Sequence, residues 1–135
     1  MTGSAKGRPA LLGIRHVALY ARDLEAAERF WVDVMGYEVE WRPDTDNVYL
    51  RGGADNLALH RGMPRAPVDE SGQLDHIGLA VPTPEDVDAW SAHLKAHGVE
   101  LHQDVKTHRD GSRSFYFFGP ESLLIQIIHH KPMTR

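Results

Sequence analysis

The chain of 135 residues contains one pattern twice, and this repeat constrains its fold more than any other feature. In the first half, residues 14–31 read IRHVALYARDLEAAERFW, and in the second half, residues 74–90 read LDHIGLAVPTPEDVDAW. Each copy begins with a strand-like alternation and continues into a helical pattern. The equivalent strands carry equivalent histidines, His16 and His76. An internal repeat of about 60 residues predicts two similar modules.

Each copy predicts one strand, one helix and then three further strands. Helices are expected over residues 24–35, with Asp23 as N-cap, and from 84 to about 97, with Thr83 as N-cap. The strands are expected over residues 13–20, 37–41, 48–51, 56–61, 74–81, 99–105, 114–118 and 123–129. The predicted fold class is therefore α+β, with two tandem βαβββ modules.

The domain organisation follows from the repeat. Residues 1–12 contain glycine, serine and proline and predict a flexible N-terminal tail, whereas residues 13–135 predict a single domain. Module 1 is expected to span about 13–61 and module 2 about 74–130. Residues 62–73, GMPRAPVDESGQ, predict a surface linker between them.

The composition argues against several functional classes. Fifteen basic and 19 acidic residues of intermixed sign give a net charge of −4, which disfavours binding to nucleic acid or to an anionic membrane. The absence of cysteine excludes a disulfide framework and a thiolate nucleophile. No apolar run approaches the ~18 residues of a membrane span, so we expect a cytoplasmic protein. Neither a glycine-rich phosphate loop nor a GxSxG motif is present.

With these motifs the chain resembles the vicinal oxygen chelate superfamily, which includes glyoxalase I, fosfomycin-resistance enzymes, extradiol dioxygenases and bleomycin-resistance binding proteins. The resemblance covers residues 13–130 and rests on IRHVALYARDLEAAERFWVDVMGYE (14–38), LDHIGLAV (74–81) and SFYFFGPESLLIQII (114–128). It implies that the modules form an open barrel-like cavity that holds the site, and that the chain forms a homodimer. The fold hosts many reactions, so the resemblance identifies none of them.

His16 and His76 are the first candidates for a metal site. By strand alternation, His16 shares a face with Ala18, and His76 shares one with Gly78, so both faces have room for a ligand. Imidazole is the commonest protein ligand of divalent transition metals. The resemblance implies that these two positions carry a metal, whereas the alternative is a pair of buried histidines bonded to the backbone.

The resemblance also implies a third ligand on the last strand, where metal-binding relatives have glutamate and this chain has Gln126. An amide oxygen can bind a divalent ion but adds no charge, so the usual 2-His-1-carboxylate iron site is absent. His60 is a fourth candidate ligand: without gaps Ala58 occupies the ligand position, and a shift of two residues brings His60 into it. The expected cofactor is a divalent ion of Fe, Mn, Ni, Co or Zn.

Two further groups are candidates for substrate contacts. Within the segment 108–116, HRDGSRSFY, the resemblance implies that Arg113 or Tyr116 orients a small anionic substrate, and the sequence leaves open which of His108, Arg109 and Arg113 faces inward. The alternative is a hairpin turn with a stabilising ion pair. Trp41 and Tyr49 are strand aromatics that would stack on a planar ligand if they face the cavity.

Two functions remain open. The first is an enzyme of the lyase, isomerase or dioxygenase type, in which a divalent metal on His16, His76 and Gln126 binds the vicinal oxygens of a small substrate. Its catalytic residues would be the two histidines with Tyr116 and Arg113. The alternative is a metal-free protein that sequesters a small molecule, as drug-resistance proteins do. The pair of histidines favours the enzyme, and Gln126 favours the binding protein.

Overall fold

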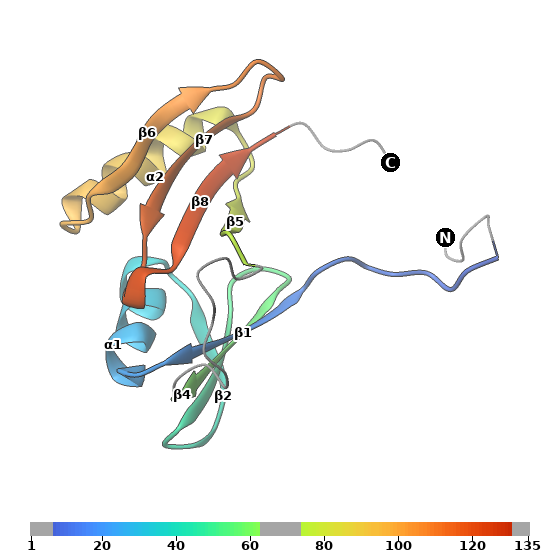
Figure 1. Cartoon of the computed structure of the whole chain (residues 1–135), viewed down its shortest axis with the longest axis vertical. Coiled ribbons are helices and arrows are strands. Elements are labelled where there is room, and N and C mark those ends of the chain that lie inside the picture. Colours follow the sequence, from blue (N-terminus) through green and yellow to red (C-terminus); the bar gives the residue numbers. More distant parts are fainter. Residues whose placement is uncertain (1–6, 63–73, 131–135) are drawn as a thin grey trace. The chain divides into compact units, whose positions relative to one another are not determined.

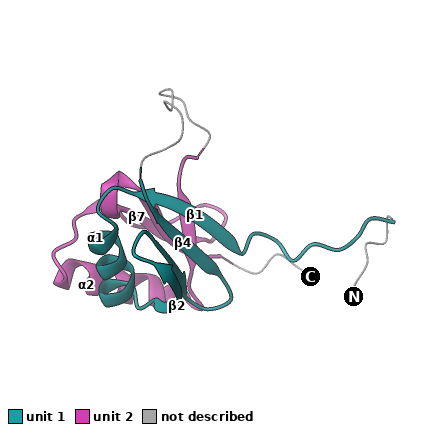
Figure 2. Ribbon diagram, turned by 90° about the horizontal axis from the view of Figure 1, so that it is seen from below, with its two compact units in different colours: residues 1–62 teal, residues 63–135 magenta. Residues whose placement is uncertain are grey.

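The computed structural model describes residues 7–62 and 74–130 and divides into two compact units, unit 1 (Met1–Gly62) and unit 2 (Met63–Arg135) (Figures 1 and 2). Half of the predicted tail, residues 1–6, and the predicted linker from residue 63 to residue 73 lie outside the described residues. Within the described ranges, no helix is long and apolar enough to cross a membrane.

Unit 1 contains one helical segment and a four-stranded mixed sheet. Its elements are β1 His16–Ala21, α1 Leu24–Arg29, a π-helical turn Phe30–Val34, β2 Glu38–Asp44, β3 Asn47–Arg51 and β4 Asn56–Arg61. The strand order is β1-β4-β3-β2. The outer strand β1 pairs parallel with β4, and the other pairs are antiparallel.

Unit 2 repeats this arrangement (Figure 1). Its elements are β5 Ile77–Ala80, α2 Pro84–Ala96, β6 Leu101–Thr107, β7 Arg113–Phe118, a 3-10 turn Pro120–Ser122 and β8 Leu124–His129. The order β5-β8-β7-β6, with β5 parallel to β8, is the same as in unit 1.

The two sheets share their irregularities as well as their strand order. Extra residues enter β2 between Val39 and Trp41 and between Trp41 and Asp44. In β6 they enter between Leu101 and Gln103 and between Gln103 and Lys106. Such bulges bend a strand and turn the following side chains to the other face. Neither sheet closes on itself. The α+β class and the two tandem βαβββ modules are therefore confirmed.

The helices begin where the sequence predicts. The Asp23 side chain accepts a hydrogen bond from the amide of Ala26 at 3.0 Å, which satisfies one of the free amides of the first turn. Thr83 and Asp86 form a reciprocal capping box ahead of α2, and Pro84 occupies the first helical position. The first helix differs from the prediction in its second half, which winds as a π-helical turn.

Each sheet packs one face against its own helical segment. The buried residues of this face are Val48, Leu50, Leu57 and Leu59 in unit 1, and Phe115, Phe117, Ile125 and Ile127 in unit 2. The helical segments contribute buried Trp31 in unit 1, and buried Val87 and Leu94 in unit 2. The opposite face, which we call the helix-free face, carries every residue of the candidate site except Arg113. Its members are His16, Ala18, Tyr20, Asn47, Tyr49, Asn56, Ala58 and His60 in unit 1, and Gly78, Ala80, Ser114, Tyr116, Gln126 and Ile128 in unit 2, with His76 directly before β5.

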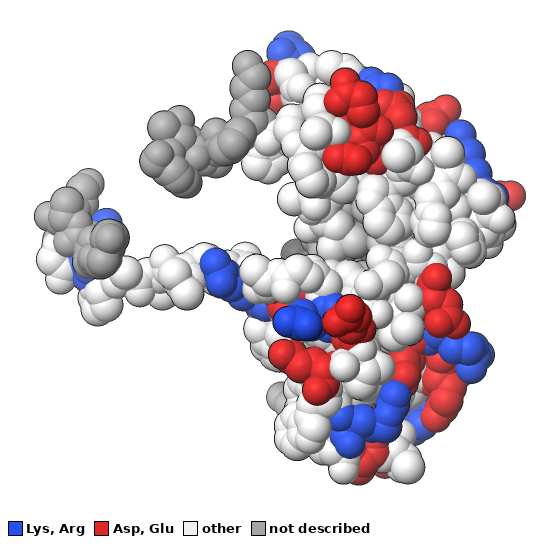
Figure 3. All heavy atoms as spheres, turned by 180° about the vertical axis from the view of Figure 1, so that it is seen from behind, with Lys and Arg blue, Asp and Glu red and all other residues white. Residues whose placement is uncertain are grey.

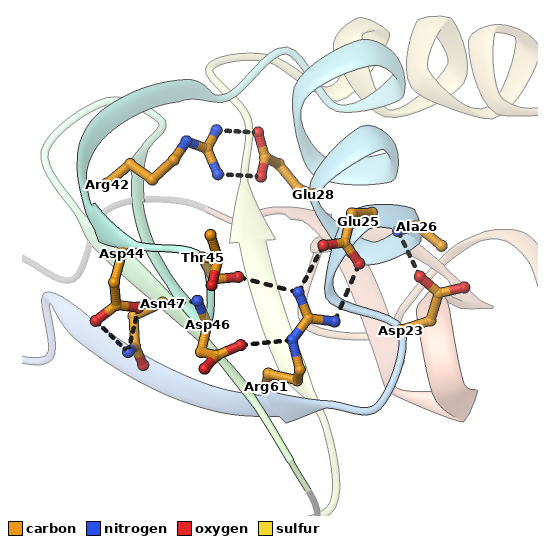
Figure 4. Close-up of polar contacts among 10 residues, drawn as sticks. All are labelled: Asp23, Glu25, Ala26, Glu28, Arg42, Asp44, Thr45, Asp46, Asn47 and Arg61. Carbon is orange, nitrogen blue, oxygen red and sulfur yellow. Dashed lines mark hydrogen bonds and ion pairs between the residues drawn. The ribbon is translucent and has the colours of Figure 1, made fainter.

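Arg61, at the end of β4, connects α1 to the turn between β2 and β3 (Figure 4). Its guanidinium donates to the Glu25 carboxylate at 3.0 Å and to the Asp46 carboxylate at 2.8 Å. A second arginine on the same sheet, Arg42, also contacts α1: its guanidinium donates to both carboxylate oxygens of Glu28. Several of the basic side chains visible in Figure 3 lie next to acidic ones. Hydrogen bonding to Arg61 lowers the pKa of Glu25 to about 2.

The lowered pKa of Glu25 predicts an acid-dependent loss of stability. Because the folded value, about 2, is below the ordinary 4.5, Glu25 stabilises the fold above pH 4.5 and loses this contribution as pH falls toward 2. We expect Glu25→Gln to flatten the decline of the unfolding free energy across this window, measured by urea unfolding at several pH values. In an Arg61→Met background, the same substitution should change the slope much less, because only the backbone hydrogen bond of Glu25 and the more distant Arg29 remain to lower its pKa. Equal slopes for Glu25→Gln and the wild type would contradict this assignment.

Tyr37 is part of the buried core of unit 1, where its ring meets that of Trp31. Its side chain is 9% exposed, its hydroxyl donates to Asp55 at 2.7 Å, and burial raises its pKa. Gly52 lies directly against the ring, because a Cβ added at Gly52 would be 2.5 Å from two ring carbons. No side chain fits there unless the ring moves.

We therefore expect Gly52→Ala to lower the unfolding free energy by about 1–3 kcal/mol, the usual cost of overpacking a core. In a Tyr37→Ala background, which removes the ring, most of this cost should disappear. Urea unfolding of the four proteins in this double-mutant cycle measures the coupling. The same cost in both backgrounds would show that contact with the ring is not its origin.

Candidate functional site

His16 begins β1 and is held by a neighbour on β4. The register pairs His16 with Asn56, and the imidazole Nδ1 lies 2.7 Å from the Asn56 amide oxygen. The Asn56 amide nitrogen in turn donates to the Glu40 carboxylate at 2.8 Å. The second imidazole nitrogen, Nε2, makes no hydrogen bond to any residue that the structure describes.

His76 directly precedes β5 and is held in a similar way. Its Nδ1 lies 2.7 Å from the carboxylate of Asp75, which can only accept, so the imidazole donates. The ring meets Tyr116 edge to face, with centroids 5.2 Å apart. Its Nε2 also has no hydrogen-bond partner within residues 7–62 and 74–130. A carboxylate on one ring nitrogen is the usual partner of a metal-binding histidine.

Gln126 lies on β8, between Gly78 on β5 and Tyr116 on β7. The side chain is 9% exposed, and its amide makes no hydrogen bond to another described residue. Gly78 lies directly beside it, since a Cβ at that position would be in van der Waals contact with the amide oxygen, at 3.4 Å. Unit 2 thus brings His76, Tyr116 and Gln126 to one part of its helix-free face.

His60 lies at the far end of the same face of unit 1. The register places Ala58 opposite Ala18, as it places Gln126 opposite Gly78, so Ala58 is the structural equivalent of Gln126. His60 is two residues farther along β4, and its Nδ1 lies 2.6 Å from the amide oxygen of Asn47.

The register also separates His60 from His16. His16 pairs with Asn56, and His60 pairs with Tyr20. His60 is therefore four residues, or about 13 Å, farther along the sheet than His16. Among the residues that the structure describes, no group of three or more His, Cys, Asp or Glu side chains lies close enough to hold a metal. A metal site built from these histidines therefore needs a ligand of another type, such as the Gln126 amide.

Arg113 has a different role from the predicted one. It projects from the helix-packed face of β7, and its guanidinium donates to both carboxylate oxygens of Asp88 on α2, at 2.9 and 2.7 Å. A third bond, of 2.6 Å, goes to the hydroxyl of Thr107. Arg113 lowers the pKa of Asp88. Alternation along β7 puts Arg113 and Tyr116 on opposite faces, and the bonds of Arg113 are those of the alternative, a stabilising ion pair.

Trp41 and Tyr49 form an aromatic surface on unit 1. Their rings stack with centroids 5.2 Å apart at 19°, and Trp41 remains 60% exposed. Tyr49 also meets His60 edge to face at 5.9 Å. The bulge between Val39 and Trp41 brings Trp41 to the helix-free face.

The hydrogen-bond partners of the histidines were not identified from the sequence. Nothing in their sequence positions marks the partners at or beside strand ends, which are Asn56, Asn47 and Asp75. Glu40 reaches Asn56 because it lies in the bulge of β2. A bulge has no clear signal in a single sequence, although a polar residue at the start of a strand that neighbours a histidine strand is a signal worth testing.

One hollow of about 620 Å³ on unit 2 lies elsewhere, along residues 106–110 at the turn between β6 and β7. It is open and is lined by the turn alone, without His76, Tyr116 or Gln126. This hollow is therefore separate from the three side chains of the candidate site in unit 2.

Comparisons with known proteins agree with the fold. A sequence model described as "Glyoxalase/Bleomycin resistance protein/Dioxygenase superfamily" matches residues 13–127. A manganese-dependent 2,3-dihydroxybiphenyl 1,2-dioxygenase from Geobacillus genomosp. 3 is 33% identical over 86 residues, which are 64% of this chain and 26% of that protein. The chain spans about a quarter of the length of this relative.

Solved structures of similar proteins cover most of the chain. Lactoylglutathione lyase from Agrobacterium tumefaciens is 24% identical with a TM-score of 0.69, covering 88% of this chain and 94% of that one. A glyoxalase family protein from Enterococcus faecalis is 27% identical with a TM-score of 0.67, covering 87% and 97%. Likeness at this level of identity establishes the shared fold and leaves the reaction open.

Proposed function

Because the chain belongs to the Glyoxalase/Bleomycin resistance protein/Dioxygenase superfamily, we propose that it is a divalent-metal-dependent enzyme acting on a small substrate with vicinal oxygens. The reaction would be of the lyase, isomerase or dioxygenase type. One observation carries the proposal. Nε2 of His16, Nε2 of His76 and the amide oxygen of Gln126 can each bind a metal, and none of them makes a hydrogen bond to a described residue.

The chemistry of these donors fits a transition metal. Both imidazoles donate Nδ1–H to an oxygen and keep Nε2, which is the arrangement that orients histidine toward a metal. The Gln126 amide oxygen would complete the set. In the proposal, His16 of unit 1 joins the two ligands of unit 2 in the same chain or in a second copy within a homodimer. Once bound, the ion would supply Lewis acidity toward the substrate oxygens.

Two other residues would act on the substrate directly. Tyr116 lies beside both His76 and Gln126, so its hydroxyl is the group that we assign to orienting the substrate. The register puts His60 about 13 Å along the sheet from His16, so we leave it out of the ligand set. Its Nδ1 is held by Asn47, as that of His16 is held by Asn56, and its Nε2 has no hydrogen-bond partner in the described part of the chain, which leaves this nitrogen available for proton transfer.

The metal content of the purified protein tests the proposal. We expect near-stoichiometric metal in the wild type, measured by mass spectrometry on protein made without a histidine tag, and its loss in His16→Ala and His76→Ala. His97→Ala is the matched control: His97 is an exposed histidine at the C-cap of α2, so this variant should retain the metal. A wild type that stays empty after exposure to Mn, Fe, Co, Ni and Zn would contradict the proposal.

A second prediction concerns the missing charge. Gln126→Glu would place a carboxylate where this chain has a neutral amide, and we expect Mn²⁺ affinity to rise by roughly tenfold or more, or about 1.4 kcal/mol in binding free energy. Without metal, the largely buried carboxylate should lower the melting temperature, and added Mn²⁺ should restore it. Calorimetric titration and thermal unfolding measure the two effects. Unchanged affinity would remove Gln126 from the ligand set.

The alternative function is a metal-free protein that binds or sequesters a small molecule. The observation that favours it is the exposed Trp41 ring stacked on Tyr49, since a large exposed aromatic is a ready surface for a planar ligand. Gln126 favours it too, because a neutral donor set binds a dication less tightly than a set with a carboxylate. An empty wild type in the metal experiment would favour this alternative.

A further inference from the structure

Unit 1 contains the same chain of hydrogen bonds twice on its helix-free face. In the first chain, the Glu40 carboxylate accepts from the Asn56 amide at 2.8 Å, and the Asn56 oxygen faces His16 Nδ1 at 2.7 Å. In the second chain, shown in part in Figure 4, Asp44 accepts from Asn47 at 2.9 Å, and the Asn47 oxygen faces the Nδ1 of His60 at 2.6 Å. Each is a carboxylate–amide–imidazole relay.

The order of groups in each relay determines where the imidazole proton lies. A carboxylate at neutral pH only accepts hydrogen bonds, so the amide must turn its NH₂ toward the carboxylate. The amide oxygen then faces the imidazole, and an oxygen can only accept, so Nδ1 must carry the proton. His16 is therefore the Nδ1–H tautomer when neutral, and Nε2 holds the lone pair.

The fold builds the first relay from three separate strands. Parallel pairing places His16 beside Asn56, and the bulge between Val39 and Trp41 is where Glu40 leaves the regular alternation of β2. An antiparallel hairpin without this bulge would direct Glu40 and Trp41 to opposite faces. Both side chains instead contact residues of the helix-free face, Asn56 and Tyr49 respectively.

We propose that Glu40 and Asn56 are positioning residues, which hold His16 with its proton on Nδ1 so that Nε2 is the nitrogen offered to a divalent ion. The purpose of this arrangement rests on the proposed metal-dependent function, but the position of the proton does not. Such partners of a ligating histidine commonly alter metal affinity by about 10–100-fold when they are removed.

The first test locates the imidazole proton in metal-free protein. Two-bond ¹⁵N–¹H spectra at about pH 8, where an unperturbed imidazole is neutral, distinguish the two tautomers, and His16→Ala identifies the His16 signals. We expect Nδ1–H in the wild type and a shift toward Nε2–H in Asn56→Leu. Asn47→Leu is the matched control: the same change in the second relay should move the proton of His60 and leave that of His16 in place.

The second test measures the affinity for Mn²⁺ and Zn²⁺ by calorimetric titration of the full chain. We expect Asn56→Leu to weaken binding by about 10–100-fold and Asn47→Leu to leave it unchanged. Thermal unfolding shows whether the variants are folded. If Asn56→Leu does not fold, Glu40→Gln replaces it, because Glu40 is exposed and its substitution frees the Asn56 amide to turn.

The outcomes separate this inference from the proposed function. If the variant of Asn56 keeps the His16 proton on Nδ1, or binds metal as tightly as the wild type, the positioning role is overturned even though the metal site stands. If the wild type binds neither ion but the proton still moves in the variant of Asn56, the proposed metal function is wrong, whereas the role of Asn56 in keeping the His16 proton on Nδ1 is confirmed. A moved proton with weakened binding supports both.

Discussion

The parallel pairing of the first and last strands of each module is the constraint on which the candidate site depends. It places His16 beside Asn56 in unit 1 and Gly78 beside Gln126 in unit 2. A shift of one residue in either pair would move every side chain of that strand to the opposite face. The buried helix-packed face prevents this, because Val17 and Leu19 would have to exchange places with the more exposed face of β1. Core packing therefore sets the register, and the register sets the site.

The duplicated frame holds different chemistry in its two copies. Equivalent first-strand positions retain a histidine, and the equivalent central positions on β3 and β7 both hold tyrosine, Tyr49 and Tyr116. On the closing strands, however, unit 1 has Ala58 where unit 2 has Gln126. In unit 1 the histidines have asparagine partners, Asn56 and Asn47, and in unit 2 the closing strand carries the amide of Gln126. The same backbone frame thus carries different polar side chains in the two units, in keeping with a fold that hosts many functions.

The sequence predicted the architecture well, because the repeat, the N-caps and the alternation are all local signals. Asp23 and Thr83 begin the two helices as expected, and the βαβββ order is confirmed twice. The site was harder to predict, since it depends on contacts between strands that a single sequence does not show. Arg113 illustrates this: its residue type suited a substrate anion, but its place on β7 directs it to Asp88. The bulge that brings Glu40 to Asn56 likewise has no recognisable signal in the sequence.

A neutral donor set has a consequence for the substrate of the proposed enzyme. Two imidazoles and one amide leave the full charge of a divalent ion uncompensated, whereas a carboxylate at the position of Gln126 would reduce it. The uncompensated charge is then available to the substrate, so a deprotonated pair of vicinal oxygens would bind more strongly than a neutral pair. Asp75 contacts His76 at Nδ1, and Glu40 reaches His16 only through Asn56, so in the proposed site both carboxylates would orient the imidazoles without contacting the ion. In such a site, ion and anionic substrate would stabilise each other's binding, and retention of the ion would depend on the substrate.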